Sequence, residues 1–352
     1  MENTVYPVCY ADSKTKKSYI EYLRALAAVT IVFLHIVMTL PANYSITELG
    51  ILNSAVFNAL YMPTKWAVPC FFMISGALLL DPKKRITIDK IWDYIKRMLW
   101  VLLIFGTGFA LMELVFSEKT IKLTMLFKAL LNVAEGKTWD HLWYLYVLIA
   151  LYIITIPLKY VIERMPQKEL RIFAAVLIIG NFIIPSINAI AGTEIKGFMI
   201  FNEYATYFIL GYLLETSRCK IGKKVIIPAV AVTLVMVVTD VMCIYNNESV
   251  FVLNHQSKDI LTLIQASCVF LFFKQCFSDK KCGTAIKAIS NCSFAIYLIH
   301  PFWINLFYKA FKFTPLSMPI WGGVPVLFIM VFILSLGTAI ILKRIPWIKR
   351  II

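Results

Sequence analysis

Residues 19–40 read YIEYLRALAAVTIVFLHIVMTL, and this stretch decides the fold class. Beyond Arg24 it contains no Asp, Glu, Lys or Arg, and its length suits a hydrocarbon core about 30 Å thick. It does not alternate apolar and polar residues as a strand of a membrane barrel does. Because only helices and closed barrels satisfy their backbone hydrogen bonds in lipid, the stretch predicts a transmembrane helix.

Similar apolar blocks recur along the 352 residues, of which 60% are hydrophobic. The predicted spans are 19–40, 55–80, 98–116, 141–160, 172–190, 198–215, 225–245, 260–277, 288–308 and 321–342. The sequence therefore predicts an all-α, polytopic membrane protein of about ten transmembrane helices. Its membrane domain is residues 19–342, flanked by a polar segment 1–18 and a basic tail 343–352. The short turn at Gly192–Gly197 leaves a re-entrant segment as an alternative to separate fifth and sixth spans.

The net charge of +15 arises mainly from basic residues between the apolar blocks. Segments on one side of the predicted membrane hold roughly three times as many Lys and Arg as segments on the other, as the positive-inside rule requires. We therefore expect both termini in the cytoplasm, and no nucleic-acid partner. The first helix lacks a small-residue cleavage site and is expected to be retained. The long outer segment 117–140 is expected to hold a short amphipathic helix on the membrane surface.

Three ionisable residues share one stripe of the first helix: Glu21, Arg24 and His35. At 100° per residue, His35 returns to within about 20° of Arg24, and Glu21 lies about 60° away. Arg24 and His35 are about 16 Å apart along the helix axis, which is too far for direct contact. The group that orients the His35 imidazole must therefore come from another helix. Ionisable residues inside lipid mark functional cavities or have structural partners.

A structural alternative applies to all three residues. Arg24 can extend its guanidinium to the inner headgroups with Glu21 as its partner, and His35 can be a hydrogen-bonded packing residue.

The Arg24-x10-His35 spacing resembles the signature of the membrane acyltransferase 3 family, which includes bacterial surface-sugar O-acetyltransferases. Four further segments are similar to the family pattern and occur in the same order. They are PCFFMISG at 69–76, HLWYL at 141–145, YFILGY at 207–212 and SFAIYLIHP at 293–301.

The resemblance implies a multi-pass protein of the bacterial plasma membrane in which His35 acts in acyl transfer and Arg24 is required. Glu21 is kept with them as a candidate catalytic residue. Many family members also carry Arg-x-x-Arg at the start of the third helix. Here that segment is Arg97-Met98-Leu99-Trp100, so the second arginine is missing and Lys96 is the nearest cation that can replace it.

The donor is expected to be acetyl-CoA, which is made in the cytoplasm and carries phosphates. The most basic inner segment offers candidate phosphate ligands at Lys84, Arg85, Lys96 and Arg97. The alternative interpretation of Lys84 and Arg85 is a topology signal alone. A neutral His35 imidazole suits a general base, and less well a transient acyl carrier.

Candidate residues for a glycan or lipid-linked sugar acceptor lie at the predicted outer ends of spans: Lys65, His141, Trp143, Tyr144 and His300. Each has a structural alternative. Lys65 can extend to the outer headgroups, Trp143 and Tyr144 can belong to an interfacial aromatic belt, and His300 can be a hydrogen bonder at a helix end. The four histidines show no ligand spacing such as H-x3-H, so no metal is expected.

Three functions compete at this point. The first is a membrane acyltransferase that moves acetyl from acetyl-CoA to a sugar hydroxyl. The second is a transporter of a small polar molecule such as serine, as proposed for some members of the family. The third is a structural scaffold for glycan assembly, in which His35 has no chemical role.

Overall fold

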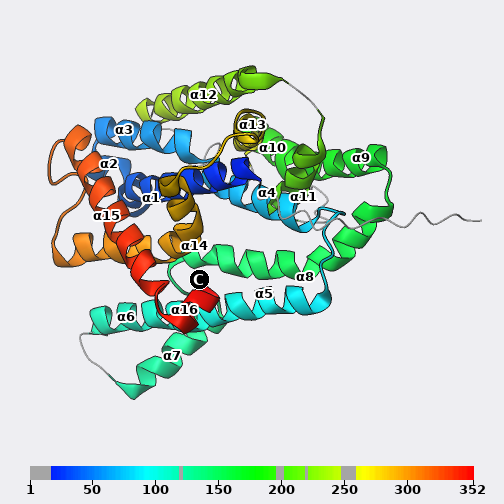
Figure 1. Cartoon of the computed structure of the whole chain (residues 1–352). Coiled ribbons are helices and arrows are strands. Elements are labelled where there is room, and N and C mark those ends of the chain that lie inside the picture. Colours follow the sequence, from blue (N-terminus) through cyan, green and yellow to red (C-terminus); the bar gives the residue numbers. More distant parts are fainter. Residues whose placement is uncertain (1–16, 119–121, 196–201, 219–220, 247–258) are drawn as a thin grey trace, which may run out of the picture.

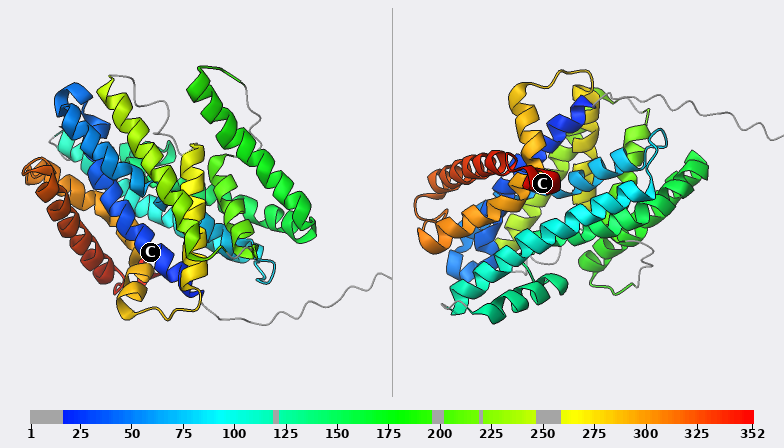
Figure 2. Two further views of the ribbon diagram at one scale, coloured as in Figure 1. Left: turned by 90° about the horizontal axis from the view of Figure 1, so that it is seen from above. Right: turned by 60° about the horizontal axis from the view of Figure 1, so that its bottom comes forward.

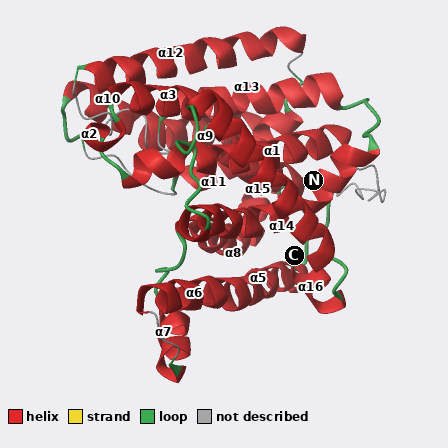
Figure 3. Ribbon diagram, turned by 90° about the vertical axis from the view of Figure 1, so that its left-hand side faces the viewer, coloured by secondary structure: helices red, strands yellow, loops and turns green. Residues whose placement is uncertain are grey.

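The computed structural model describes residues 17–118, 122–195, 202–218, 221–246 and 259–352. Throughout these ranges the chain forms helices and connecting turns, without a strand, and the helices pack into one bundle (Figures 1 and 3). The helices are α1 (Ser18–Asn43), α2 (Ile46–Leu49), α3 (Ile51–Tyr61), α4 (Ala67–Leu79), α5 (Ile88–Val101), α6 (Thr107–Glu118), α7 (Leu123–Ala134), α8 (Trp143–Arg164), α9 (Gln167–Ile178), α10 (Ile184–Ala191), α11 (Glu203–Thr216), α12 (Ile226–Tyr245), α13 (Ile260–Phe277), α14 (Thr284–Asn305), α15 (Ile320–Leu342) and α16 (Pro346–Ile351). The predicted all-α fold is confirmed.

Eight helical runs in the described part of the chain are long and apolar enough to cross a membrane. They are Ser18–Asn43, Ile51–Leu79, Ile88–Glu118, Asp140–Arg164, Gln167–Ala191, Gly222–Tyr245, Ile260–Phe277 and Ile320–Leu342. The other two predicted spans also form helices: α11 is short, and α14 carries several polar side chains. The chain is a multi-pass membrane protein. The predicted orientation, with both termini inside, stays a prediction.

The third membrane run begins at Ile88, ten residues before the predicted start at 98. Its first part, α5, is amphipathic: Ile91, Ile95 and Met98 are buried, while the intervening charged residues lower the mean hydropathy. The helix therefore extends ten residues beyond the predicted span at this end. As a result, Lys96 and Arg97 lie well inside a helix, about 100° apart around its axis.

Helix α1 is the centre of the bundle (Figure 2). It packs against α3, α4, α13, α14 and α15, and its buried residues lie all round the helix. A helix that is apolar on every side is expected in the interior of a membrane bundle. The polar residues of α1 are therefore held among other helices, away from lipid.

The closest helix contact joins α4 to α11 through two glycines. A Cβ atom on Gly76 would lie 1.7 Å from the Phe208 carbonyl oxygen, and one on Gly211 would lie 2.1 Å from the Met73 carbonyl oxygen. Small residues allow such an approach between membrane helices, where packing rather than water exclusion drives association. Both glycines belong to sequence segments that resemble the family pattern.

The predicted short helix in the segment 117–140 is present as α7, which packs against α6. Its location on the membrane surface stays a prediction. Leu123 and Phe127 are among its most exposed side chains. The predicted segment 1–18 lies outside the described residues except for its last two. The predicted tail 343–352 contains α16, which packs against α5 and buries Ile348.

Candidate active site

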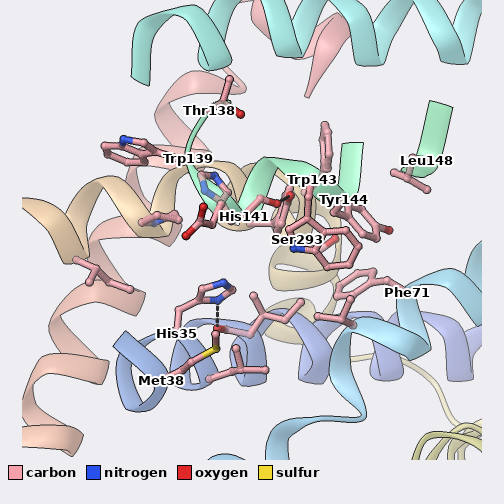
Figure 4. A pocket seen from close by; sticks show the side chains of 18 of the residues that line it. His35, Met38, Phe71, Thr138, Trp139, His141, Trp143, Tyr144, Leu148 and Ser293 are labelled. Atoms are coloured by element: carbon pink, nitrogen blue, oxygen red, sulfur yellow. Dashed lines mark hydrogen bonds between the residues drawn. The ribbon is translucent and has the colours of Figure 1, made fainter. Parts of the chain in front are cut away.

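A cavity of about 1020 Å³ runs beside α1 and is lined by side chains from most of the central helices. Its lining includes both Arg24 and Asn43, which are about 28 Å apart along the axis of α1. That length is close to the thickness of a hydrocarbon core. Figure 4 shows His35 rising from α1 toward the side of the cavity from which His141, Trp143 and Tyr144 project.

The two ends of the cavity differ in charge. We call the end lined by Arg24, Arg97 and Lys343 the basic end. The acidic end carries Asp140 and Glu113, the only carboxylate side chains that line the cavity within the described residues. An anionic ligand is therefore favoured at the basic end and disfavoured at the acidic end.

His35 is held in one orientation by the backbone of its own helix. Its Nδ1 lies 2.9 Å from the Ile31 carbonyl oxygen, which can only accept a hydrogen bond. In the neutral ring, Nδ1 therefore carries the proton and Nε2 keeps its lone pair. Within the described part of the chain, His35 Nε2 has no hydrogen-bond partner. The free nitrogen of His35 can therefore act as a base toward a ligand in the cavity.

His300 supports His35 from α14. Its Nδ1 lies 3.1 Å from the Ile296 carbonyl oxygen, so in the neutral ring its Nε2 is an acceptor. That Nε2 lies 3.2 Å from His35 Nδ1 and shares the proton that His35 donates to Ile31. The expectation that the orienting group must come from another helix was therefore wrong in part, because the Ile31 carbonyl belongs to α1 itself and His300 provides the second contact. His300 is completely buried and does not line the cavity.

His141 stands on the far side of His300, with ring centroids 5.9 Å apart. It lies in the short turn before α8, where the Tyr297 hydroxyl donates to its carbonyl oxygen. The side chain lines the cavity and is 5% exposed, and its Nε2 has no hydrogen-bond partner among the described residues. A buried polar atom without a partner normally has an explanation, and here a ligand atom can provide one.

The aromatic pair Trp143 and Tyr144 also lines the cavity, where it packs with Phe72 and Tyr204. Their ring contacts are those of a packed aromatic cluster. Tyr144 is partly buried, and Trp143 is more exposed. Both are placed where a ligand can contact them.

Lys65 was predicted near the outer end of a span, but it lies near the middle of the run Ile51–Leu79. The helix is interrupted there by a tight turn at Met62–Thr64, which includes a proline. Lys65 is buried, lies 3.5 Å from the Asp259 carboxylate and lines the cavity. The alternative in which Lys65 extends to the headgroups is therefore wrong.

The predicted donor-binding cations separate into two groups. Arg97 lines the cavity with Arg24, whereas Lys84, Arg85 and Lys96 do not. Lys96 is exposed, lies over the Trp92 ring and forms an ion pair with Asp93 at 3.5 Å. It does not replace the missing arginine, because it is on a different face of α5 from Arg97.

Lys84 lies in the loop after α4, where burial and the neighbouring Lys17 lower its pKa. Arg85 is exposed. Glu21 is buried but lies outside the cavity lining.

Sequence reasoning missed Lys343 and the Glu113–Lys309 ion pair as parts of the cavity, and Asp140 lines it beside His141. Lys309 Nζ lies 2.8 Å from a Glu113 oxygen, and both residues line the acidic end. Asp140 directly precedes His141, so the HLWYL segment was a local signal for it. Lys343 had only the signal of a cation directly after a span, which is also what topology requires.

A comparison with family models now bears on this geometry. The model described as Acyltransferase domain, that of the acyltransferase 3 family, matches residues 17–344. The chain belongs to this family. It is therefore a membrane acyltransferase, as the resemblance implied. No curated protein and no solved structure matches the chain.

The family segments meet in this cavity. Arg24 and His35 line it from α1, Pro69 from α4, His141 from the turn before α8, and Tyr297 from α14. The YFILGY segment contributes Gly211 to the close contact that holds α11 against α4. Segments that are far apart in the sequence thus form one site or its direct support.

Proposed function

We propose that this acyltransferase moves acetyl from acetyl-CoA to a hydroxyl of a cell-surface glycan or lipid-linked sugar, with His35 Nε2 as general base. The observation that carries the proposal is the hydrogen bond from His35 Nδ1 to the Ile31 carbonyl oxygen, which leaves Nε2 unprotonated in the neutral ring. His35 also lines a cavity whose opposite ends differ in charge.

In this reaction, Nε2 of His35 accepts the proton of the sugar hydroxyl while its oxygen forms a bond to the thioester carbonyl carbon. The carbon–sulfur bond then breaks, and the CoA sulfur takes the proton from the imidazolium. During the step the positive charge strengthens the hydrogen bonds from Nδ1 to Ile31 and His300. His300 therefore acts as a positioning residue for His35.

The charges of the cavity support the proposed direction of approach. The phosphates of acetyl-CoA fit the basic end, and its pantetheine arm extends along the cavity toward His35. Uncharged sugar hydroxyls fit the acidic end, where carboxylates and aromatic rings are common ligands of sugars. With the predicted orientation, the donor enters from the cytoplasm of a bacterial plasma membrane.

The test compares His35→Asn with His35→Ala in purified protein held in nanodiscs. The asparagine amide can still donate to the Ile31 carbonyl oxygen but cannot accept a proton from the substrate. The assay uses radiolabelled acetyl-CoA as donor and dodecyl maltoside as a sugar-bearing acceptor. In both variants the transfer rate should fall by a factor of about 10² to 10⁴.

Circular dichroism and thermal unfolding of His35→Asn should match the wild type. If His35→Asn transfers acetyl at the wild-type rate, His35 is not the base. Uptake of serine into vesicles without release of CoA would instead support the transporter.

A further inference from the structure

The basic end of the cavity brings together three cations, Arg24, Arg97 and Lys343. Within the described residues, none of Arg24, Arg97 and Lys343 forms an ion pair with an acidic side chain. Charges brought this close to apolar surroundings are normally paired or bind a ligand. The basic end therefore has the charge to bind an anionic group of more than one negative charge.

Arg97 is oriented toward the cavity by two contacts. Its Nε donates to the Ile351 carbonyl oxygen of α16 at 2.7 Å, and its guanidinium lies 5.5 Å from the centre of the Phe294 ring. The Nε bond leaves the two terminal nitrogens of the guanidinium for a ligand. These nitrogens match the paired oxygens of a phosphate.

Lys343 directly follows α15 and lines the same end of the cavity. Its Nζ donates to the Asn291 carbonyl oxygen of α14, which leaves two of its three N–H groups for a ligand. Burial lowers the pKa of Lys343, and the nearby Arg97 lowers it further. An anion bound between the two cations would relieve both effects.

We propose that Lys343 binds the phosphate groups of the acyl donor together with Arg97, and so supplies the second cation of the donor site. This inference rests on the proposed function for the identity of the donor. Trp100 stands where many family members have their second arginine, and its side chain is 53% exposed on the outside of the bundle. The charge missing from α5 is thus provided by the end of α15.

The direct test measures binding of CoA to the full-length protein in nanodiscs by calorimetry. Lys343→Ala should weaken CoA binding about 10-fold, as expected for loss of a hydrogen bond between charged groups. Lys343→Arg should retain most of the affinity. Arg344→Ala is the matched control, because Arg344 is the next residue, is exposed and does not line the cavity. Equal CoA affinity in the wild type and Lys343→Ala would overturn the inference.

A second measurement identifies the phosphates as the recognised groups. With acetyl-CoA as donor, Lys343→Ala should raise the KM about 10-fold, whereas with S-acetylpantetheine, which has no phosphate, the KM should equal that of the wild type. An equal rise for both donors would contradict phosphate binding by Lys343. Absence of transfer from either donor in the wild type would count against the proposed function, and CoA calorimetry would still decide the role of Lys343.

Discussion

The two ends of the cavity use charge differently. At the basic end, Arg97 and Lys343 donate to backbone carbonyl oxygens. Within the described residues, neither forms an ion pair with an acidic side chain. At the acidic end, the Glu113 carboxylate is neutralised by Lys309 at 2.8 Å. Uncompensated charge is costly beside lipid and is retained where a ligand compensates it. This difference supports our proposal that a charged ligand binds at the basic end and a neutral one at the acidic end.

The largest expected effect disturbs the packing of α4 against α11, two helices that contribute Phe71 and Tyr204 to the lining of the cavity. Gly211→Ala places a Cβ where the Met73 carbonyl oxygen already lies, so α11 must move away from α4. Overpacking of this kind costs about 1–3 kcal/mol or more, and here the obstacle is backbone. Thermal unfolding in nanodiscs should show a lower Tm, with donor and acceptor use impaired together.

Gly337→Ala is the control for that experiment, since a Cβ there meets no atom within 4 Å. Its Tm should equal or exceed that of the wild type, because alanine favours a helix more than glycine does. A Gly211→Ala protein with unchanged Tm would show that the contact between α4 and α11 can relax.

The next largest effect distinguishes the two ends of the cavity, because it changes the KM of only one substrate. Arg97→Ala should raise the KM for acetyl-CoA roughly 10- to 100-fold, since it removes the guanidinium that we propose binds a phosphate of the donor. The KM for dodecyl maltoside should be unchanged. Lys96→Ala is the matched control, because Lys96 is the preceding residue and is paired with Asp93 outside the cavity. If the two variants gave the same donor KM, the difference between the ends would have no functional meaning.

The smallest effect belongs to the acidic end. Asp140→Asn keeps the size of the side chain but replaces one acceptor oxygen with a donor group. We expect a rise of about 3- to 10-fold in the KM for dodecyl maltoside, with the KM for acetyl-CoA unaltered. Steady-state kinetics with each substrate varied in turn provide both values. A change confined to the acetyl-CoA KM would reverse the proposed assignment of the ends.

The helices were predictable because apolar length is a local property of the sequence. Apolar length did not identify the first ten residues of α5 as helix, because the charged residues on one face lower their mean hydropathy. Helical spacing also placed Arg24 and His35 on one stripe, and both line the cavity.

Contacts between helices were not predictable in the same way. Spacing predicted a partner for His35 from another helix, but only the packing of α1 against α14 identifies His300. Similarly, Lys96 and Arg97 are neighbours in sequence, and the packing of α5 decides which one faces the cavity. Lys343 joins the site only because α15 packs beside α14 and the following helix, α16, packs against α5.

A cavity lined by α1 from Arg24 to Asn43 also has a consequence for the membrane potential. A polar route of about 28 Å through a bundle is a potential leak for protons and small cations. The positive charges of Arg24, Arg97 and Lys343 raise an electrostatic barrier to such ions, as an arginine does in water-selective pores. The same three residues that suit an anionic ligand would therefore also oppose the passage of cations along the cavity.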